Sequence, residues 1–292
     1  MDNKLKAYLQ LHFVVLLYGL TAILGDLITL PAFSLVWWRV LITSFSLLIL
    51  LKFGNSLMKV PRGTILRLAG IGILIALHWV TFYGAIKLSN ASVALAAFAS
   101  TSLFTAILEP LMTGRPFEKL ELIIGILIIP AMILIANNLD VTLLNGLWVG
   151  LFSAFLASIF SIMNKQMVGK ASDYEISFIE LFSAFCFLSL IMPFVITGDT
   201  AVLPAKADWI YLLILSLCCT TLAFVINLKV LKHLTAFDTN LVINLEPVYG
   251  MLLAAIILKE HKELTPHFYI GVFIILLLVF SHPIIKKYQS NA

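Results

Sequence analysis

The chain has 292 residues, of which 61% are hydrophobic and only 12% are charged, and its formal net charge is +4. An average soluble domain carries about 25% charged residues, so this composition excludes a water-soluble globular protein and indicates an integral membrane protein. The chain has no cluster of Lys and Arg interleaved with aromatic residues in a soluble module, so its positive charge predicts no nucleic-acid partner.

Ten apolar windows are each long enough to cross about 30 Å of hydrocarbon. They span residues 9–30, 34–52, 65–86, 91–113, 120–136, 146–166, 176–197, 209–231, 236–258 and 267–285. The first window follows two lysines as a secretory leader would, but it extends to residue 30 and no soluble domain follows, which predicts a retained span. The windows are too apolar for barrel strands of alternating polarity, so the predicted fold is an all-α membrane bundle of ten helices.

The distribution of Lys and Arg predicts the orientation of this bundle. With ten spans and a cytoplasmic N-terminus, the inner loops and tails hold fourteen of the nineteen Lys and Arg residues, and one, Arg39, lies within a span. The outer loops hold four: Lys87, Lys206, Lys259 and Lys262. Basic residues gather on the cytoplasmic side of membrane proteins, so both termini are predicted to be cytoplasmic.

The ten windows divide into two sets of five, in units of residues 1–138 and 139–292. A shift of 145 residues places Lys87 on Lys232, and each unit has a tight link between its third and fourth windows. Because five is an odd number, the second unit is predicted to insert upside down relative to the first. Inverted repeats of this kind place a solute site near the membrane midplane, where the two units meet.

Asp26 and Arg39 flank the predicted turn at residues 31–33 at nearly equal distances. In an antiparallel helical hairpin they would lie at similar depth, which predicts a structural ion pair that neutralises a costly buried arginine. The alternative is that Arg39 binds a carboxylate of the substrate.

The window 236–258 carries Asn240, Asn244 and Glu246 among aliphatic and aromatic residues. Asn240 and Asn244 are four residues apart and share a helix face. Polar groups well inside a membrane segment usually face a cavity or a partner, so the two amides are predicted to contact a solute. Glu246, near the midplane, either couples transport to an ion or contacts the substrate, or it is a structural group beside a kink at Pro247.

Further candidates for the cavity wall are Tyr18, His78, Trp79 and Asn227. Aromatic walls suit apolar or aromatic side chains, and also cations. For His78 the alternative is a neutral, hydrogen-bonded packing role. For Trp79 the alternative is an anchor at the outer membrane interface, which is the role predicted for Tyr83.

The three cysteines, Cys186, Cys218 and Cys219, lie in apolar windows without metal-type spacing and are predicted to be buried, inert thiols. Glu109, near the cytoplasmic end of the fourth window, is predicted to be a hydrated structural carboxylate. The sequence holds no P-loop, zinc-protease motif or nucleophile elbow. It therefore predicts no ATP hydrolysis, no enzyme activity, no cofactor and no metal.

Several short motifs, on ten windows arranged as five plus five, resemble the EamA-type family of the drug/metabolite transporter superfamily. They are Tyr18-Gly19, Arg39, and the run from Pro247 through Leu258-Lys259-Glu260 to Gly271. The chain departs from the family pattern in its first half, at Ser102 and Gly114-Arg115. The resemblance covers nearly the whole chain and implies a secondary transporter in a bacterial cell membrane, commonly an exporter of amino acids or other small metabolites.

We therefore expect a secondary transporter that moves a small organic solute by alternating access, driven by protons or by the solute's own gradient. Its expected partners are the solute and the lipid bilayer. A complete pair of repeats can form a path within a monomer, and an oligomer is equally compatible with the sequence. The alternatives are a polytopic membrane enzyme, a channel and a scaffold. A channel would require a continuous polar face along several windows, which the sequence lacks.

Overall fold

The computed structural model of the protein describes residues 3–53, 60–136, 144–197, 200–243 and 245–257, together with residues 266–267, 270–271, 273–274, 277–278, 281 and 285. In this part of the chain every regular element is a helix, and the only β contact is an isolated bridge between Val168 and Ala171. The prediction of an all-α fold is confirmed.

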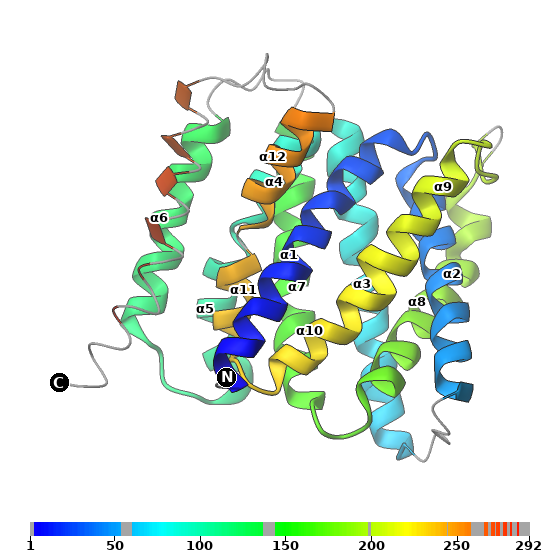
Figure 1. The fold of residues 1–292 in the computed structure, drawn as a ribbon, viewed down its shortest axis with the longest axis horizontal. Coiled ribbons are helices and arrows are strands. Elements are labelled where there is room, and N and C mark those ends of the chain that lie inside the picture. The colour runs from blue at the N-terminus through cyan, green and yellow to red at the C-terminus, as the bar shows by residue number, and fades with distance from the viewer. Residues whose placement is uncertain are drawn as a thin grey trace.

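The helices follow the predicted windows (Figure 1). The longer ones are α1 (Asn3–Leu27), α2 (Ala32–Phe53), α3 (Arg62–Leu88), α6 (Lys119–Ala136), α7 (Leu144–Met167) and α8 (Asp173–Val195). The shorter ones are α4 (Ala91–Phe98), α5 (Thr101–Thr113), α9 (Asp208–Leu213), the π-helix η2 (Ile214–Leu222), α10 (Ala223–Leu231), α11 (Ala236–Ile243) and α12 (Glu246–Ile257). Among the described residues, seven helical stretches are long and apolar enough to cross a membrane. The total of ten and the cytoplasmic termini stay predictions, and the window 267–285 lies largely outside the described residues.

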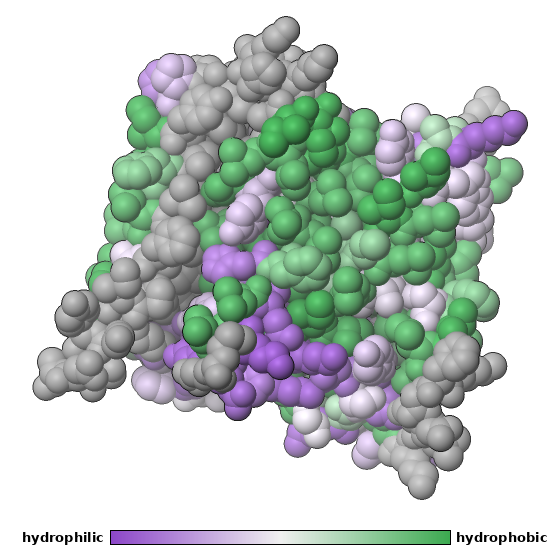
Figure 2. Space-filling view, in the orientation of Figure 1, coloured by the Kyte–Doolittle hydropathy of each residue, from purple (hydrophilic) through white to green (hydrophobic). Residues whose placement is uncertain are grey.

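The outer surface of the bundle is apolar. Large hydrophobic side chains such as Leu190, Phe194 and Ile256 are exposed. Figure 2 shows hydrophobic residues over the upper and right parts of the face that it presents, and hydrophilic residues gathered from its centre toward the bottom. Lipid chains are as apolar as these side chains, so exposure to a bilayer carries no penalty. This surface belongs to a multi-pass membrane protein.

The two predicted units are closely intertwined. The helix α3 packs along α7 and α8, α2 packs along α8, and α1 packs along α10 and α12. Each of these contacts joins a helix that ends before residue 138 to a helix that begins after it. The core of the bundle is therefore shared between the units.

Two of the predicted spans are interrupted in the same way. The fourth is split into α4 and α5 at Ala99 and Ser100, and the ninth is split into α11 and α12 before Glu246. A shift of 145 residues carries the first residues of α4 and α5 onto the first residues of α11 and α12. The sequence predicts a kink at Pro247, whereas the structure starts a new helix at Glu246. Such a break is stable in a membrane where the freed backbone groups face protein or a cavity.

The helices α1 and α12 approach closely at Gly19 and Gly250. A Cβ atom on Gly19 would lie 2.7 Å from the backbone nitrogen of Gly250, which is too close for two non-bonded atoms. Small residues at such a contact let two membrane helices touch through their backbones.

We expect Gly19→Ala to destabilise the protein by about 1–3 kcal/mol, because the added methyl group forces α1 away from α12. The matched variant Gly70→Ala changes a helical glycine whose Cβ position has nothing within 4 Å, so it should be at least as stable as the wild type. Thermal unfolding in detergent measures the melting temperatures of Gly19→Ala and Gly70→Ala beside that of the wild type. Equal melting temperatures for the two variants would contradict the close packing of α1 on α12.

Candidate functional site

A cavity of about 60 Å³ lies in the core of the bundle. Its polar lining residues are Tyr18, Thr21, Arg39, His78, Thr101, Ser161, Cys219, Thr220, Asn227 and Glu246. Its apolar lining residues are Trp79, Phe82, Phe98, Ala157, Phe160, Phe224 and Ile243. Among the described residues, the lining thus combines a cation, a carboxyl group and several aromatic rings.

Arg39 of α2 is held firmly at this cavity, with only 3% of its surface exposed. Its guanidinium carbon lies 3.7 Å from the centroid of the Trp79 ring. Nε donates a hydrogen bond to Thr220 Oγ1 at 2.7 Å, and Nη1 donates one to the Tyr83 hydroxyl at 2.8 Å. No described residue accepts a hydrogen bond from Nη2. A stacked guanidinium with an unused donor is suited to bind a carboxylate.

The predicted ion pair between Asp26 and Arg39 does not form. Asp26 is exposed at the end of α1, whereas Arg39 points into the bundle core. Lys87 Nζ donates to the backbone oxygens of Ile28 at 2.7 Å and Asp26 at 3.4 Å. Asp26 lies one residue before the end of α1, whereas Arg39 lies seven residues beyond the start of α2, so the two are not equally deep in their helices as the prediction requires.

Glu246 lines the same cavity as Arg39. It is the first residue of α12, and 4% of its surface is exposed. No described residue donates a hydrogen bond to its carboxyl group. The amino end of a helix carries partial positive charge, which favours a carboxylate at this position. The fold therefore presents this carboxyl group to the cavity with hydrogen-bonding capacity to spare.

Residues related by the 145-residue shift meet around the cavity. The shift pairs Trp79 with Phe224, Phe82 with Asn227, Phe98 with Ile243 and Thr101 with Glu246, and all eight residues line it. The rings of Trp79 and Phe224 touch edge to face, with centroids 6.4 Å apart. The cavity thus lies where the first half of the chain meets the second.

The aromatic residues of α3 are all buried. His78 Nδ1 lies 2.8 Å from Ser153 Oγ and 3.0 Å from the Ser153 carbonyl oxygen, and the ring stacks on Phe98. His78 therefore lines the cavity and is also a hydrogen-bonded packing residue. Trp79 lies under Arg39, and Tyr83 is fully buried. The sequence predicts Tyr83 to be an anchor at the outer membrane interface, and this prediction is wrong. The same role, which is one of two alternatives for Trp79, is also excluded.

Two other predicted wall residues, Tyr18 and Asn227, also line the cavity. Asn227 Oδ1 is buried and accepts no hydrogen bond from a described residue. Asn244 and the side chain of Asn240 lie outside the described residues, so their predicted contact with a solute stays a prediction.

Thr220 is the most informative lining residue that the sequence patterns miss. It belongs to the π-helix η2, in which its hydroxyl donates to the Leu215 carbonyl oxygen at 2.6 Å and accepts from Arg39. Such π-helical turns occur frequently at functional sites, but no apolar periodicity distinguishes them from an α-helix. Phe224 and Thr101 carry a usable signal, because the 145-residue shift relates them to Trp79 and Glu246.

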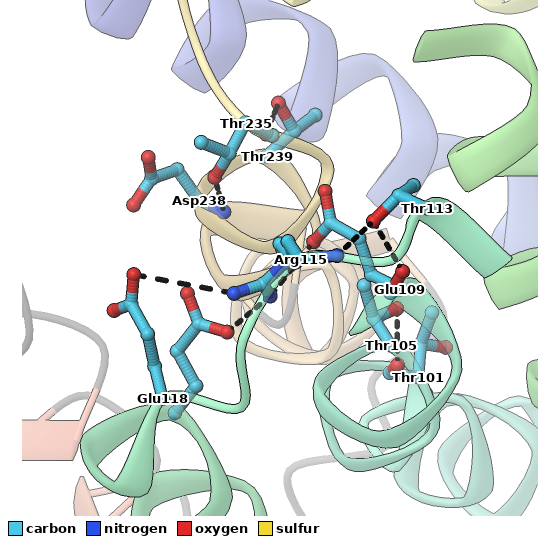
Figure 3. Close-up of polar contacts among 10 residues, drawn as sticks. Thr101, Thr105, Glu109, Thr113, Arg115, Glu118, Thr235, Asp238 and Thr239 are labelled. Atoms are coloured by element: carbon cyan, nitrogen blue, oxygen red, sulfur yellow. Dashed lines mark hydrogen bonds and ion pairs between the residues drawn. The ribbon is translucent and has the colours of Figure 1, made fainter. Parts of the chain in front are cut away.

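A polar face, which we call the α5 stripe, runs along α5 and consists of Thr101, Thr105, Glu109 and Thr113 (Figure 3). These residues are four apart and share one side of the helix. The hydroxyls of Thr105 and Thr113 donate to the backbone oxygens of Thr101 at 2.8 Å and Glu109 at 2.6 Å. Because Thr101 lines the cavity, the stripe leads from the cavity to the carboxyl end of α5.

Arg115 lies at the end of the stripe among three carboxyl groups (Figure 3). Its Nη2 is 3.1 Å from Glu109 Oε2 and also pairs with Glu121, and its Nη1 is 4.0 Å from Glu118 Oε1. Burial lowers the pKa of Arg115, but the hydrogen bond to Glu121 and the charges of Glu109 and Glu121 outweigh burial and raise this pKa above its ordinary value. Glu109 is thus buried and ion-paired, and not the hydrated carboxylate that the sequence predicts.

We expect Arg115→Ala to lower the free energy of unfolding by about 3 kcal/mol, because it removes the cation that pairs with the buried carboxyl groups of Glu109 and Glu121. The matched variant Lys119→Ala removes a nearby exposed cation and should change it by less than about 0.5 kcal/mol. Thermal unfolding measures the stability of both variants. If Arg115→Ala is as stable as Lys119→Ala, the ion pairs of Arg115 do not hold α5 to α6.

Three comparisons with known proteins each find a match over nearly the whole chain. The EamA-like transporter family matches residues 5–137 and 144–281. The chain is 26% identical, over an alignment 304 positions long, to YetK of Bacillus subtilis (strain 168), described as an uncharacterized transporter, and the alignment covers 99% of this chain and 90% of that protein. A crystal structure of another protein superposes with a TM-score of 0.75 at 14% identity, over 97% of this chain and 98% of that one. At this identity the likeness shows the fold alone.

Proposed function

The chain belongs to the EamA-like transporter family, and from this premise we propose that it moves a small organic solute across the membrane by alternating access. The observation that carries this proposal is the meeting of Arg39 and Glu246 on one buried cavity with aromatic walls. Solute sites are typically concave and apolar, with a few polar groups that fix the orientation of the ligand.

We further propose ten spans in two inverted units, residues 1–138 and 139–292, with both termini cytoplasmic. The matching breaks of the fourth and ninth spans support the repeat, as do the four residue pairs around the cavity. The excess of Lys and Arg in the proposed inner loops supports the orientation. Rocking one unit against the other would then open the cavity to each side in turn. One chain suffices for this path.

The proposed solute is an amino acid or a related metabolite. The unused donor of Arg39 suits a carboxylate, and the rings around it suit an apolar or aromatic side chain. Tyr18, His78, Trp79 and Asn227 are the proposed wall residues, and Asn240 and Asn244 are proposed as further contacts. Ligand pockets commonly measure about 300–1,000 Å³. The cavity of about 60 Å³ would therefore have to widen as the solute binds.

We propose that transport is outward and coupled to protons through Glu246. A carboxyl group that lines the same cavity as Arg39, without a hydrogen-bond donor among the described residues, can exchange a proton when a solute changes the charge balance of the cavity. The α5 stripe is the proposed wall of the cytoplasmic half of the path, because it leads away from the cavity along α5 and α11 packs against the same helix.

Thermal stabilisation of the purified protein tests the solute site. A panel of amino acids, amines and nucleobase-type metabolites is measured at one acidic and one alkaline pH, since a ligand that binds only the folded state raises the melting temperature. We expect one chemical class to stabilise the wild type. This stabilisation should be lost in Trp79→Leu and kept in Trp148→Leu, which changes an exposed tryptophan on the outer surface. Stabilisation that survives in Trp79→Leu would place binding elsewhere.

A further inference from the structure

Glu180 of α8 is a fully buried acidic side chain that does not line the cavity. Its exposed fraction is 0%, and neither carboxyl oxygen accepts a hydrogen bond from a described residue. The proposed transport site gives it no role. A buried carboxyl group in a membrane segment is costly unless it is paired or protonated.

The surroundings of Glu180 exclude water. The helix α3 crosses α8 at Gly72, where a Cβ atom would collide with the backbone carbonyl group of Glu180, so the two backbones touch. Asn164, in the last turn of α7, is the polar neighbour of the carboxyl group. Asn164 is itself buried, and its Oδ1 also lacks a hydrogen-bond donor among the described residues.

No described charged side chain compensates Glu180. Lys165, next to Asn164 on α7, donates to the backbone oxygens of Leu231 and Leu234. The other described charged or titratable groups within α8 and the helices packed against it have partners elsewhere or are exposed. They are Arg39, Arg62, Arg67, His78, Tyr83, Lys87, Asp173, Tyr174, Glu175, Cys186 and Lys229.

We propose that Glu180 and Asn164 form a proton-binding site between α3, α7 and α8. The amide of Asn164 can offer a neutral N–H donor to an ionised Glu180, but this leaves the negative charge uncompensated and Asn164 Oδ1 without a donor. One proton on Glu180 supplies the donor, because the carboxyl O–H can then donate to Asn164 Oδ1. It also removes an uncompensated buried charge.

The contact between α3 and α8 seals this site, so the proton exchanges only when the two helices separate. Motion of α8, and not occupancy of the cavity, therefore controls proton exchange at Glu180. Its part in a transport cycle rests on the proposed function, whereas the presence of the proton does not.

Infrared spectroscopy of the purified full chain tests the proton directly, because a protonated carboxyl group and a carboxylate absorb at different frequencies. At neutral pH we expect a protonated carboxyl band in the wild type that Glu180→Gln lacks. The matched variant Glu175→Gln changes a carboxyl group that accepts a hydrogen bond from the Ser172 backbone in the same helix, and should keep this band. Asn164→Leu should shift the band, and transfer of the wild type to D₂O should shift it as the site opens.

Identical spectra for the wild type and Glu180→Gln would overturn the proposal, and a band that never shifts in D₂O would overturn proton exchange. An unshifted band in Asn164→Leu would remove Asn164 from the site. Because glutamine imitates a protonated glutamate, Glu180→Gln should melt at the wild-type temperature, and a large drop would also contradict a bound proton. The infrared bands and the melting temperatures do not depend on transport. A negative result would therefore overturn the proton site without contradicting the proposed function.

Discussion

Glu246→Gln is expected to abolish proton-driven accumulation of the solute in proteoliposomes while leaving exchange of solute for solute intact. The amide has nearly the same shape as the carboxyl group but cannot titrate. One coupled proton contributes about 1.4 kcal/mol per pH unit, which corresponds to about tenfold in accumulation. The variant should therefore lose about tenfold in accumulation under a gradient of about one pH unit.

The control for this prediction is Glu118→Gln, which changes an exposed carboxyl group near Arg115 and should accumulate solute as the wild type does. Both proteins are assayed for accumulation under a pH gradient and for exchange without one. If Glu246→Gln keeps the wild-type rate and pH dependence, Glu246 has a structural role at the start of α12.

Arg39→Lys is expected to weaken binding of a solute carboxylate by about 10–100-fold, which corresponds to about 1.4–2.8 kcal/mol. Lysine keeps the charge but cannot stack flat on Trp79 while it donates to both Thr220 and Tyr83. Titration of the stabilising solute, followed by thermal unfolding, measures the change in affinity.

Arg62→Lys is the matched control, because Arg62 is exposed at the start of α3. Its affinity should equal that of the wild type. Wild-type affinity in Arg39→Lys would show that Arg39 holds the helices together without contacting the solute. The melting temperature without solute separates this case from a general loss of stability.

Much of the fold follows from the sequence, because apolar windows of membrane length reveal where helices run. The same windows contain little information about which side of a helix faces the core. Asp26 and Arg39 show the consequence, since their spacing from the predicted turn says nothing of the direction in which each side chain points. Arg39 finds its partners on α3 and η2, at positions far away in sequence.

The sequence predicts several lining residues of the candidate site, because polar residues are rare in the apolar windows and therefore stand out. Tyr18, His78, Trp79, Asn227 and Glu246 all line the cavity, and for the polar members the reason is that a polar side chain deep in an apolar span usually faces a cavity or a partner. Whether they contact a solute stays a prediction.

Two features required the three-dimensional structure. The break between α4 and α5 falls at Ala99 and Ser100, where neither Pro nor Gly announces it. Glu180 lies in a window as apolar as its neighbours, and its isolation becomes visible only when α3 is seen to close over it.

Counterflow in proteoliposomes tests the central claim most directly. Vesicles loaded with a high concentration of one member of the amino-acid, amine and nucleobase panel are diluted into a trace of the same isotopically labelled compound. Alternating access predicts that internal solute of one chemical class accelerates uptake of the label, relative to empty vesicles containing the protein and to vesicles without protein. Uptake of every compound at the protein-free rate, or uptake that internal solute does not accelerate, would contradict a transporter that works by alternating access.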